Sequence, residues 1–346
     1  MRALVKYGNK DGEVEIREYP IPKIGPEDVL LEVKAASICG WDIEMWRHTM
    51  ANPVSVPVIQ GHEFSGIIKE VGERVTEFKK GDRVVSETSA VVCGKCPQCM
   101  TGNYHLCGSR KGFGYGVDGA FTDYVKVPGK CLHMIPDSIP FEIAAMTEPV
   151  CVTYQSMVVL TRILPGEPVL IIGPGPIGLF CLQMVKACGA CPVILAGRSS
   201  DAMRFKVAEK IGVDYIINVD TEDALQSIMK ITNGKGCHVV ADAAGNEKAF
   251  KLAVDAVARC GQITKIGWGP KPINFTLDPI ISKAARIQGT FSHNWATWES
   301  AISMIKNKKI NMELMLTKCI KLDQWLETFN EIEESKIVKA VMLFNQ

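Results

Sequence analysis

The sequence predicts an α/β protein that combines an open parallel sheet with a β-rich part preceding it. From about residue 168, short apolar runs alternate with segments of helical periodicity, a pattern typical of parallel sheets. Residues before that point form strand-like runs punctuated by Gly and Pro. The chain has 346 residues, more than one core comfortably fills, so we expect two domains.

In the first part, three runs have the composition of strands. They cover residues 29–35, 64–71 and 83–86. We therefore expect an irregular β domain over residues 1–152.

In the second part, strands and helices alternate. The predicted strands are 169–172, 193–196, 215–217, 238–241 and 262–266, and the predicted helices are 177–188, 203–211, 223–231 and 248–258. This series gives a parallel-sheet domain over residues 153–288. The regularity ends after Gly289, and we expect residues 289–346 to return to the first domain.

Composition and charge exclude several classes of function. The net charge of +1 gives no electrostatic reason to bind nucleic acid or an anionic membrane. The apolar stretch 169–185 is interrupted by Gly and Pro, so we expect no membrane helix there. The N-terminal residues lack a secretory signal, and the 13 cysteines are odd in number, so we expect a cytoplasmic protein with metal-binding thiols rather than disulfides.

A glycine-rich loop follows the first apolar strand of the second part. Residues 173–178 read G-P-G-P-I-G, which matches G-x-G-x-x-G between a strand and an amphipathic helix. Such a loop lets the backbone approach a pyrophosphate at the helix N-terminus. The predicted cofactor-binding residues of this loop are Gly173, Gly175, Pro176, Ile177 and Gly178. The alternative is a βα loop without a ligand.

The end of the next strand favours NADP(H) over NAD(H). An acid at this tip would bind the ribose 2′-hydroxyl, but the sequence there is Gly197-Arg198-Ser199-Ser200. Arg198 can instead pair with a 2′-phosphate, and Ser199 can donate a hydroxyl hydrogen bond. Asp201 is the nearby acid that would favour NAD(H).

Four cysteines within fifteen residues predict a structural zinc site. Cys93, Cys96, Cys99 and Cys107 can close a tetrahedral shell around Zn²⁺ and leave no open coordination position. An iron–sulfur cluster and a set of unrelated thiols are the alternatives.

The chain resembles the medium-chain zinc-containing alcohol dehydrogenase superfamily over nearly its whole length. Gly61-His62-Glu63, the four-cysteine loop and the 173–178 loop occur in that family's order. The resemblance implies a Rossmann domain, a GroES-like β-rich catalytic domain and a second, catalytic zinc held by Cys39, His62 and Glu148. It places Glu63 close to that metal, and Asp42 behind the ligating His.

Within the superfamily, the chain is most similar to the sorbitol (polyol) dehydrogenase branch. The similarity rests on Glu148-Pro149 and on the segment 291–305. In that branch two polar residues line the polyol site, and here these positions are Ser292 and His293. They differ from the Arg-Tyr pair typical of animal sorbitol dehydrogenases, which leaves the exact substrate open.

Trp41 departs from the family, which has Ser or Thr there as the start of a proton relay. Trp cannot accept a proton. Three alternative proton paths are then open: zinc-bound water with Glu63 or Glu148, the side chain of Glu44, or the substrate itself. Trp41 is expected to shape the substrate pocket.

These residues together predict hydride transfer between NADP(H) and a polyol or related secondary alcohol and its ketone. The alternatives are a threonine-like amino alcohol, an aldehyde or a simple alcohol as substrate, and a catalytically silent nucleotide-binding protein. Family likeness implies a homodimer or homotetramer.

Overall fold

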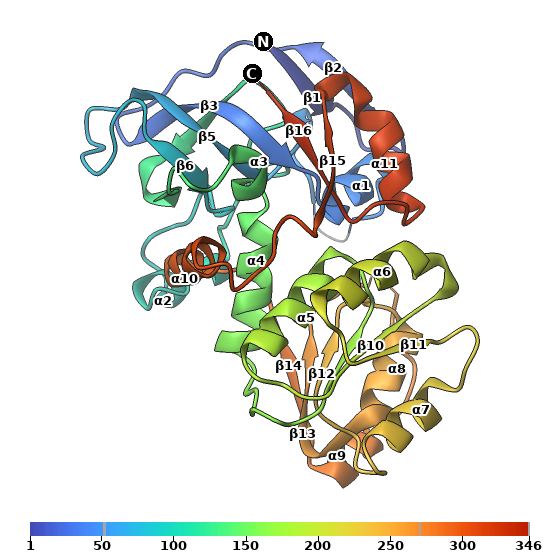
Figure 1. Cartoon of the computed structure of the whole chain (residues 1–346). Helices are drawn as coiled ribbons and strands as arrows, with labels where there is room; N and C mark the ends of the chain where they lie inside the picture. Colours follow the sequence, from blue (N-terminus) through green and yellow to red (C-terminus); the bar gives the residue numbers. More distant parts are fainter. Residues whose placement is uncertain (51–52, 270, 345–346) are drawn as a thin grey trace. The chain divides into compact units, whose positions relative to one another are not determined.

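The computed structural model describes residues 1–50, 53–269 and 271–344, which divide into two compact units. The first unit comprises Met1–Glu148, His293–Lys306 and Leu316–Gln346, and the second comprises Pro149–Ser292 and Asn307–Met315. Figure 1 shows the helices and strands of both units.

The second unit is built on a six-stranded parallel sheet. Its strands are β9 (Val169–Ile172), β10 (Val193–Gly197), β11 (Tyr215–Asn218), β12 (Cys237–Asp242), β13 (Val257–Lys265) and β14 (Arg286–Gly289). Their order is β11-β10-β9-β12-β13-β14, and every pair is parallel. This is the 3-2-1-4-5-6 order of Rossmann folds, with its switch point between β9 and β12.

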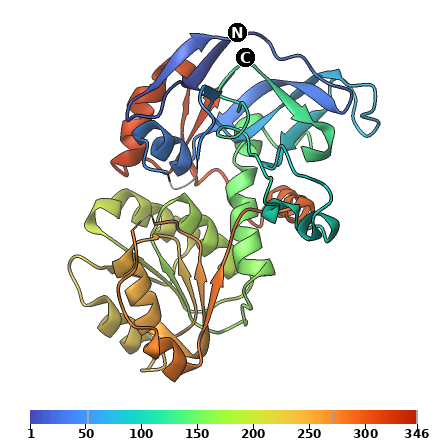
Figure 2. The same ribbon diagram turned by 180° about the vertical axis from the view of Figure 1, so that it is seen from behind.

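Helices cover both faces of this sheet, as Figures 1 and 2 show. They are α5 (Pro176–Ala187), α6 (Ala202–Ile211), α7 (Ala224–Ile231), α8 (Glu247–Ala256) and α9 (Asp278–Lys283). The unit also contains the π-helix η3 (Gln155–Val159) and the 3-10 helix η4 (Ser199–Asp201). Alternate residues of β9 face opposite ways. Leu170 and Ile172 join the core under α7 and α8, and Ile171 faces Gly178 of α5.

The first unit is mainly antiparallel β structure. Its larger sheet has the order β15-β16-β3-β5-β6-β8, with β7 paired to β3, and its smaller sheet has the order β2-β1-β4. The strands are β1 (Arg2–Lys6), β2 (Val14–Glu18), β3 (Asp28–Ser37), β4 (Val58–Ile59), β5 (Glu63–Val71), β6 (Arg83–Ser86), β7 (Tyr124–Pro128), β8 (Leu132–Met134), β15 (Leu316–Ile320) and β16 (Lys339–Leu343). The C-terminal strand β16 pairs with β3 near its Ser37 end.

Short helices connect these strands. They are α1 (Gly40–Arg47), α2 (Pro97–Met100), η1 (Tyr104–Leu106), η2 (Gly129–Cys131), α3 (Phe141–Ala144), α10 (Trp295–Lys306), η5 (Leu322–Gln324) and α11 (Trp325–Glu333). Helix α4 (Thr147–Tyr154) starts in the first unit and ends in the second.

The predicted fold class, a Rossmann sheet with a separate β-rich domain, is confirmed. Two predicted boundaries are wrong: the helix expected to reach residue 258 ends at Ala256, and the strand expected to start at residue 262 starts five residues earlier. Val257 instead begins β13, where it pairs with Cys237 ahead of a register shift. In the described residues no helix has the length and apolarity needed to cross a membrane.

Candidate metal centres and cofactor site

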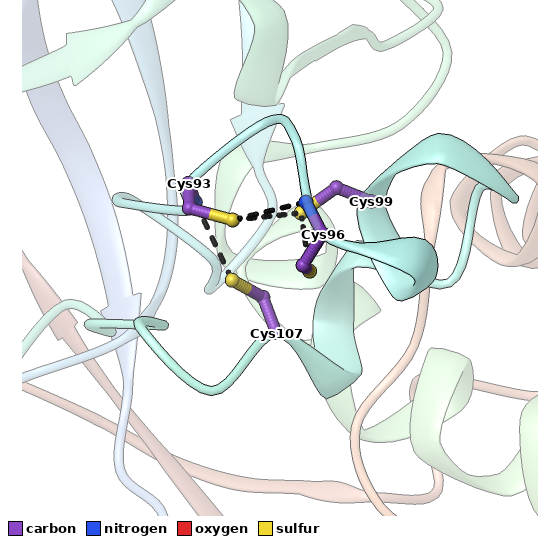
Figure 3. Close-up of side chains that lie close together, drawn as sticks. All are labelled: Cys93, Cys96, Cys99 and Cys107. Atoms are coloured by element: carbon purple, nitrogen blue, oxygen red, sulfur yellow. Dashed lines mark hydrogen bonds between the residues drawn. The ribbon is translucent and has the colours of Figure 1, made fainter.

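The four cysteines of the 93–107 loop converge on one point (Figure 3). Their sulfur atoms lie within 4.8 Å of one another, with 3.5 Å between Cys96 Sγ and Cys99 Sγ and 4.0 Å between Cys93 Sγ and Cys99 Sγ. Sulfurs at the corners of a tetrahedron around Zn²⁺, each about 2.3 Å from the ion, are about 3.8 Å apart. The loop therefore has the size of a single-zinc shell.

Backbone amides around the loop favour thiolates. The N–H groups of Lys95 and Cys96 lower the pKa of Cys93 to about 6, and those of Cys93 and Ser109 lower the pKa of Cys107. Desolvation and the neighbouring Cys96 raise the pKa of Cys99 to about 12. Four neighbouring thiolates repel one another, so all four can be ionised only when a cation is bound between them. A set of four sulfur donors fits Zn²⁺.

A second donor group forms where the end of β3 lies beside the start of β5. Ser37 of β3 pairs with Glu63 of β5, so Cys39 and His62, which flank these two residues, come together. Donor atoms of Cys39, His62 and Glu63 lie within 4.8 Å of one another. Sulfur, imidazole and carboxylate are the usual ligands of Zn²⁺, so this group also fits the ion.

Asp42 lies behind His62. Its Oδ2 accepts a hydrogen bond of 2.9 Å from Cys39 N–H, and its Oδ1 is 3.8 Å from His62 Nδ1. Burial raises the pKa of Asp42 to about 6. Neither Asp42 Oδ1 nor His62 Nδ1 has a hydrogen-bond partner in the described residues. This arrangement suits an acid that orients a metal-bound imidazole.

Lys339 is a site residue that the sequence does not reveal. Its Nζ donates to Glu63 Oε2 at 2.5 Å and to Ile38 O at 2.8 Å, and the pair is almost fully buried. Lys339 is separated from Glu63 by 276 positions, and only the pairing of β16 with β3 brings it close. A single sequence contains no local signal for this contact.

Negative groups crowd around Cys39. Burial, with the charges of Glu63, Asp42 and Glu148, raises the pKa of the Cys39 thiol well above its usual range, although Lys339 opposes this effect. A bound cation would reverse this shift, because a coordinating thiol is deprotonated.

The predicted ligand Glu148 lies outside the group of three. It sits in the first turn of α4, and its Oε1 is 2.9 Å from His293 Nε2. His293 is fully buried, and its Nδ1 accepts a hydrogen bond of 2.7 Å from Trp298 Nε1. Burial opposes ionisation of Glu148, but the hydrogen bond from His293, together with the nearby charge of Lys339, leaves the pKa of Glu148 lowered.

Trp41 and Glu44 lie on α1, directly after Cys39. The Trp41 ring packs edge-on against Tyr115 at 5.9 Å between centroids, and its buried Nε1 has no partner among the described residues. Glu44 is half-buried, and burial raises its pKa. Ser292 belongs to the second unit and has a φ of 54°.

The glycine loop of the second unit fits a dinucleotide. Gly173 has a φ of 100°, and a Cβ on Gly178 would lie 1.8 Å from Gly173 O, so the helix packs against the strand end only with glycine there. A Cβ on Gly175, at the N-cap of α5, would meet nothing within 4 Å. That open space at a helix N-terminus is where a pyrophosphate binds in this fold.

At the end of β10, both carboxylate oxygens of Asp201 already have partners within the protein. Its Oδ2 accepts from Arg198 N–H at 3.0 Å, and its Oδ1 pairs with Arg204 Nη1 at 3.3 Å. Arg198 and Ser199 are exposed, whereas the Arg204 side chain is only 11% exposed. Arg204 is a further cation at this tip that the sequence analysis missed.

Comparison with known proteins defines the class as zinc-type dehydrogenases. Residues 25–137 match the alcohol dehydrogenase GroES-like domain, and residues 176–307 match the zinc-binding dehydrogenase domain. The chain is 37% identical to a sorbitol dehydrogenase of Halalkalibacterium halodurans over 99% of both chains. It is 36% identical to an L-threonine 3-dehydrogenase of Pyrococcus horikoshii, over 95% of this chain and 94% of the relative.

A solved structure supports the same class of protein. A zinc-binding dehydrogenase from Sinorhizobium meliloti 1021, bound to NADP, superposes with a TM-score of 0.90 at 28% identity, covering 99% of this chain and 98% of the other. The chain thus belongs to the zinc-containing alcohol dehydrogenase family, in the branch that includes sorbitol dehydrogenases, and it is an alcohol dehydrogenase. The predicted family and enzyme class are confirmed.

Proposed function

We propose that the chain is a zinc-dependent, NADP(H)-linked dehydrogenase that interconverts a polyol or sugar-derived secondary alcohol and its ketone. The observation that supports this most is the buried group of Cys39, His62 and carboxylates in a chain 37% identical to a sorbitol dehydrogenase. Trp41 adds an unpaired indole N–H near Cys39, which can hydrogen-bond a hydroxyl of a polyhydroxy substrate.

In the proposed catalytic site, Cys39 and His62 hold Zn²⁺ together with a carboxylate. We keep Glu148 as the third ligand, and Glu63, whose carboxylate lies within 4.8 Å of both other donors, as a carboxylate that can approach the ion. When bound, zinc supplies a Lewis acid that favours the alkoxide of the substrate, and the nicotinamide accepts the hydride. Asp42 orients His62, and Lys339 neutralises Glu63.

The proton released from the substrate needs an acceptor other than Trp41. Glu63 and Glu148 are buried carboxylates beside the metal group, and Glu44 is a half-buried carboxylate on α1. We propose that one of these acids receives the proton, with water as a bridge where needed.

The preference for NADP(H) rests on the end of β10. Arg198 is exposed there, and the acid Asp201 is engaged by the Arg198 amide and by Arg204. Because Asp201 is held by these two contacts, the Arg198 guanidinium and the Ser199 hydroxyl are left to meet a 2′-phosphate, while the Asp220 carboxylate accepts from Ser199 N–H at 2.8 Å. Backbone of Gly173, Gly175 and Gly178 receives the pyrophosphate.

The four-cysteine loop binds a second, structural zinc in this proposal. Its sulfur spacing fits one ion, and four thiolates leave no coordination position for a substrate.

We also propose that the chain forms a homodimer through β14, and a homotetramer is the predicted alternative. In the described sheet β14 is an edge strand, and apolar side chains are exposed on it and on the preceding α9. Ile287 is 43% exposed and Ile281 is 76% exposed. An edge strand of this kind can pair with its copy across a two-fold axis. Light scattering should give twice the chain mass, and Ile287→Lys should lower it to that of a monomer.

The experiment that tests the function is turnover on a panel of polyols with NAD and NADP in parallel, followed by the absorbance of the reduced nicotinamide. The panel includes L-threonine, because the 36% identical threonine dehydrogenase makes an amino alcohol the second candidate substrate. We expect the highest kcat/KM with a polyol and NADP. Turnover of L-threonine alone would overturn the polyol assignment, and cofactor binding without turnover of any alcohol would favour a silent nucleotide-binding protein.

A further inference from the structure

His293 links Glu148 to helix α10 through two hydrogen bonds. Trp298, on the first turn of α10, lies 2.7 Å from His293 Nδ1, and Glu148 Oε1 lies 2.9 Å from His293 Nε2. His293 and Trp298 have 0% and 1% of their surfaces exposed. All three residues belong to the first unit.

These contacts define the tautomer of His293. An indole N–H only donates, so His293 Nδ1 must be the acceptor and cannot hold a hydrogen. The ring hydrogen then lies on Nε2, where it is donated to Glu148 Oε1. A doubly protonated ring would place two N–H groups against each other at Nδ1, so the arrangement fits only the neutral Nε2–H form.

Packing holds the indole in place. The Trp298 ring stacks on His133 with a centroid distance of 5.5 Å and an interplanar angle of 10°, and it meets the His293 ring edge-on at 5.2 Å. His133 itself is anchored by Glu299 of α10, at 2.6 Å from its Nδ1. Trp298 therefore has little freedom to turn its N–H away from His293.

One oxygen of Glu148 is fixed by this chain of contacts, and the other is not. The described residues give Oε2 no hydrogen bond, and Glu148 keeps 9% of its surface exposed. We propose that Trp298 and His293 are positioning residues that anchor Oε1 of Glu148 and thereby present Oε2 to the metal ion, water or substrate hydroxyl. The proposal rests on the proposed function, because it concerns the same site. It gives His293 a role inside the protein in place of direct contact with substrate.

The test compares variants that keep or remove the hydrogen bond. His293→Leu removes the donor to Glu148, and His293→Gln keeps a donor and an acceptor on a side chain of similar reach. Trp298→Phe keeps the ring stacked on His133 but removes the N–H. Trp295→Phe, the same substitution on the same helix at a side chain that is 54% exposed, is the matched control.

We expect kcat/KM for the polyol to fall by about 10- to 100-fold in His293→Leu, as for other residues that orient a metal-site ligand. His293→Gln should recover most of that loss. Trp298→Phe should lose about 10-fold, and Trp295→Phe should match the wild type. Equal kinetics in His293→Leu and wild type, or no difference between His293→Gln and His293→Leu, would overturn the proposal.

A measurement that does not depend on turnover distinguishes failure of this proposal from failure of the proposed function. In ¹⁵N-histidine-labelled protein, His293 (identified by the signal lost in His293→Gln) should show the neutral Nε2–H tautomer, and Trp298→Phe should disturb it. A cationic ring or the Nδ1–H tautomer in the wild type overturns the positioning role. Absence of polyol turnover combined with the Nε2–H tautomer overturns the proposed function and leaves the hydrogen-bonded arrangement supported.

Discussion

The four-cysteine loop and the Cys39 group are both candidate zinc sites, but the chain builds them in opposite ways. Cys93, Cys96, Cys99 and Cys107 lie in one loop, so their spacing alone brings the sulfurs together. Cys39 and His62 meet only because Ser37 of β3 pairs with Glu63 of β5. The loop can hold its ion through local structure, whereas the second group depends on the register of a whole sheet.

The two groups also differ in their surroundings. Backbone amides stabilise thiolates in the loop, but buried acids surround Cys39, together with the buried cation Lys339. A saturated shell of four thiolates suits a structural ion, and a mixed set of thiol, imidazole and carboxylates suits one that keeps a position for substrate. Changes at the two groups should therefore have different consequences.

The largest effect is expected at Cys39. Cys39→Ser should lower kcat/KM by on the order of 1,000-fold or more, because the lost Lewis acid contributes several kcal/mol to the transition state. Zinc should fall from two ions per chain to one, with the melting temperature nearly unchanged. Kinetics and elemental analysis measure both, and Cys191→Ser, at an exposed thiol, is the control. Full activity in Cys39→Ser would remove this residue from the catalytic site.

The next effect should appear at the loop and affect stability instead of chemistry. Cys96→Ser should also reduce zinc to one ion per chain, but it should lower the melting temperature by on the order of 10 °C, because metal binding there contributes to folding. The folded fraction should keep its kcat. Calorimetry and active-site titration test this, and a large loss of kcat with unchanged melting would contradict the division of roles.

A smaller effect is expected at the cofactor site. Arg198→Ala removes a charge-assisted contact to the 2′-phosphate, so KM for NADP should rise by about 10- to 100-fold. The KM for NAD should stay the same, since NAD lacks that phosphate. Arg17→Ala, at a surface arginine of the first unit, is the control. A parallel rise in both KM values would show that Arg198 does not distinguish the cofactors.

The smallest effect concerns Cys237, a thiol whose pKa is shifted by burial alone. Burial raises the pKa of Cys237, in the core of the second unit, to about 12. The unfolded thiol loses its proton near pH 8.5, so the stabilisation is complete below that pH and is lost as pH rises toward 12, by at most about 1.4 kcal/mol per pH unit. Cys237→Ala should therefore make the decline of melting temperature between pH 9 and 11 shallower. If the melting temperature of the variant falls with pH as steeply as that of the wild type, the predicted contribution of Cys237 is wrong.

Much of the fold was predictable because its signals are local. The strands 169–172 and 83–86 have the predicted bounds, and the glycine loop follows β9 and opens α5, whose first turn contains Gly178. The end of α8 was not predictable from periodicity, since Val257 suits either a helix or a strand and pairing with Cys237 decides. Likewise, the four-cysteine loop needed only spacing, but Cys39 and His62 could be joined only by family resemblance.

Contacts between distant residues explain what the sequence could not show. Lys339 reaches Glu63 through the pairing of β16 with β3, and His293 reaches Glu148 across 145 positions. The hydrogen bond from Trp298 joins two residues only five positions apart. It could still not be predicted, because it depends on how the buried His293 ring is oriented just before α10. These partners set the charge around the metal-binding side chains and orient them, but no sequence motif marks them.

Two zinc ions with unequal roles are the central feature of the proposed enzyme. The most direct test is to remove zinc stepwise with a chelator while measuring zinc per chain, polyol turnover and melting temperature on the same samples. We expect two ions per chain at the start, with turnover lost in proportion to the first ion removed and the melting temperature falling only with the second. One zinc per chain with full activity would contradict the account.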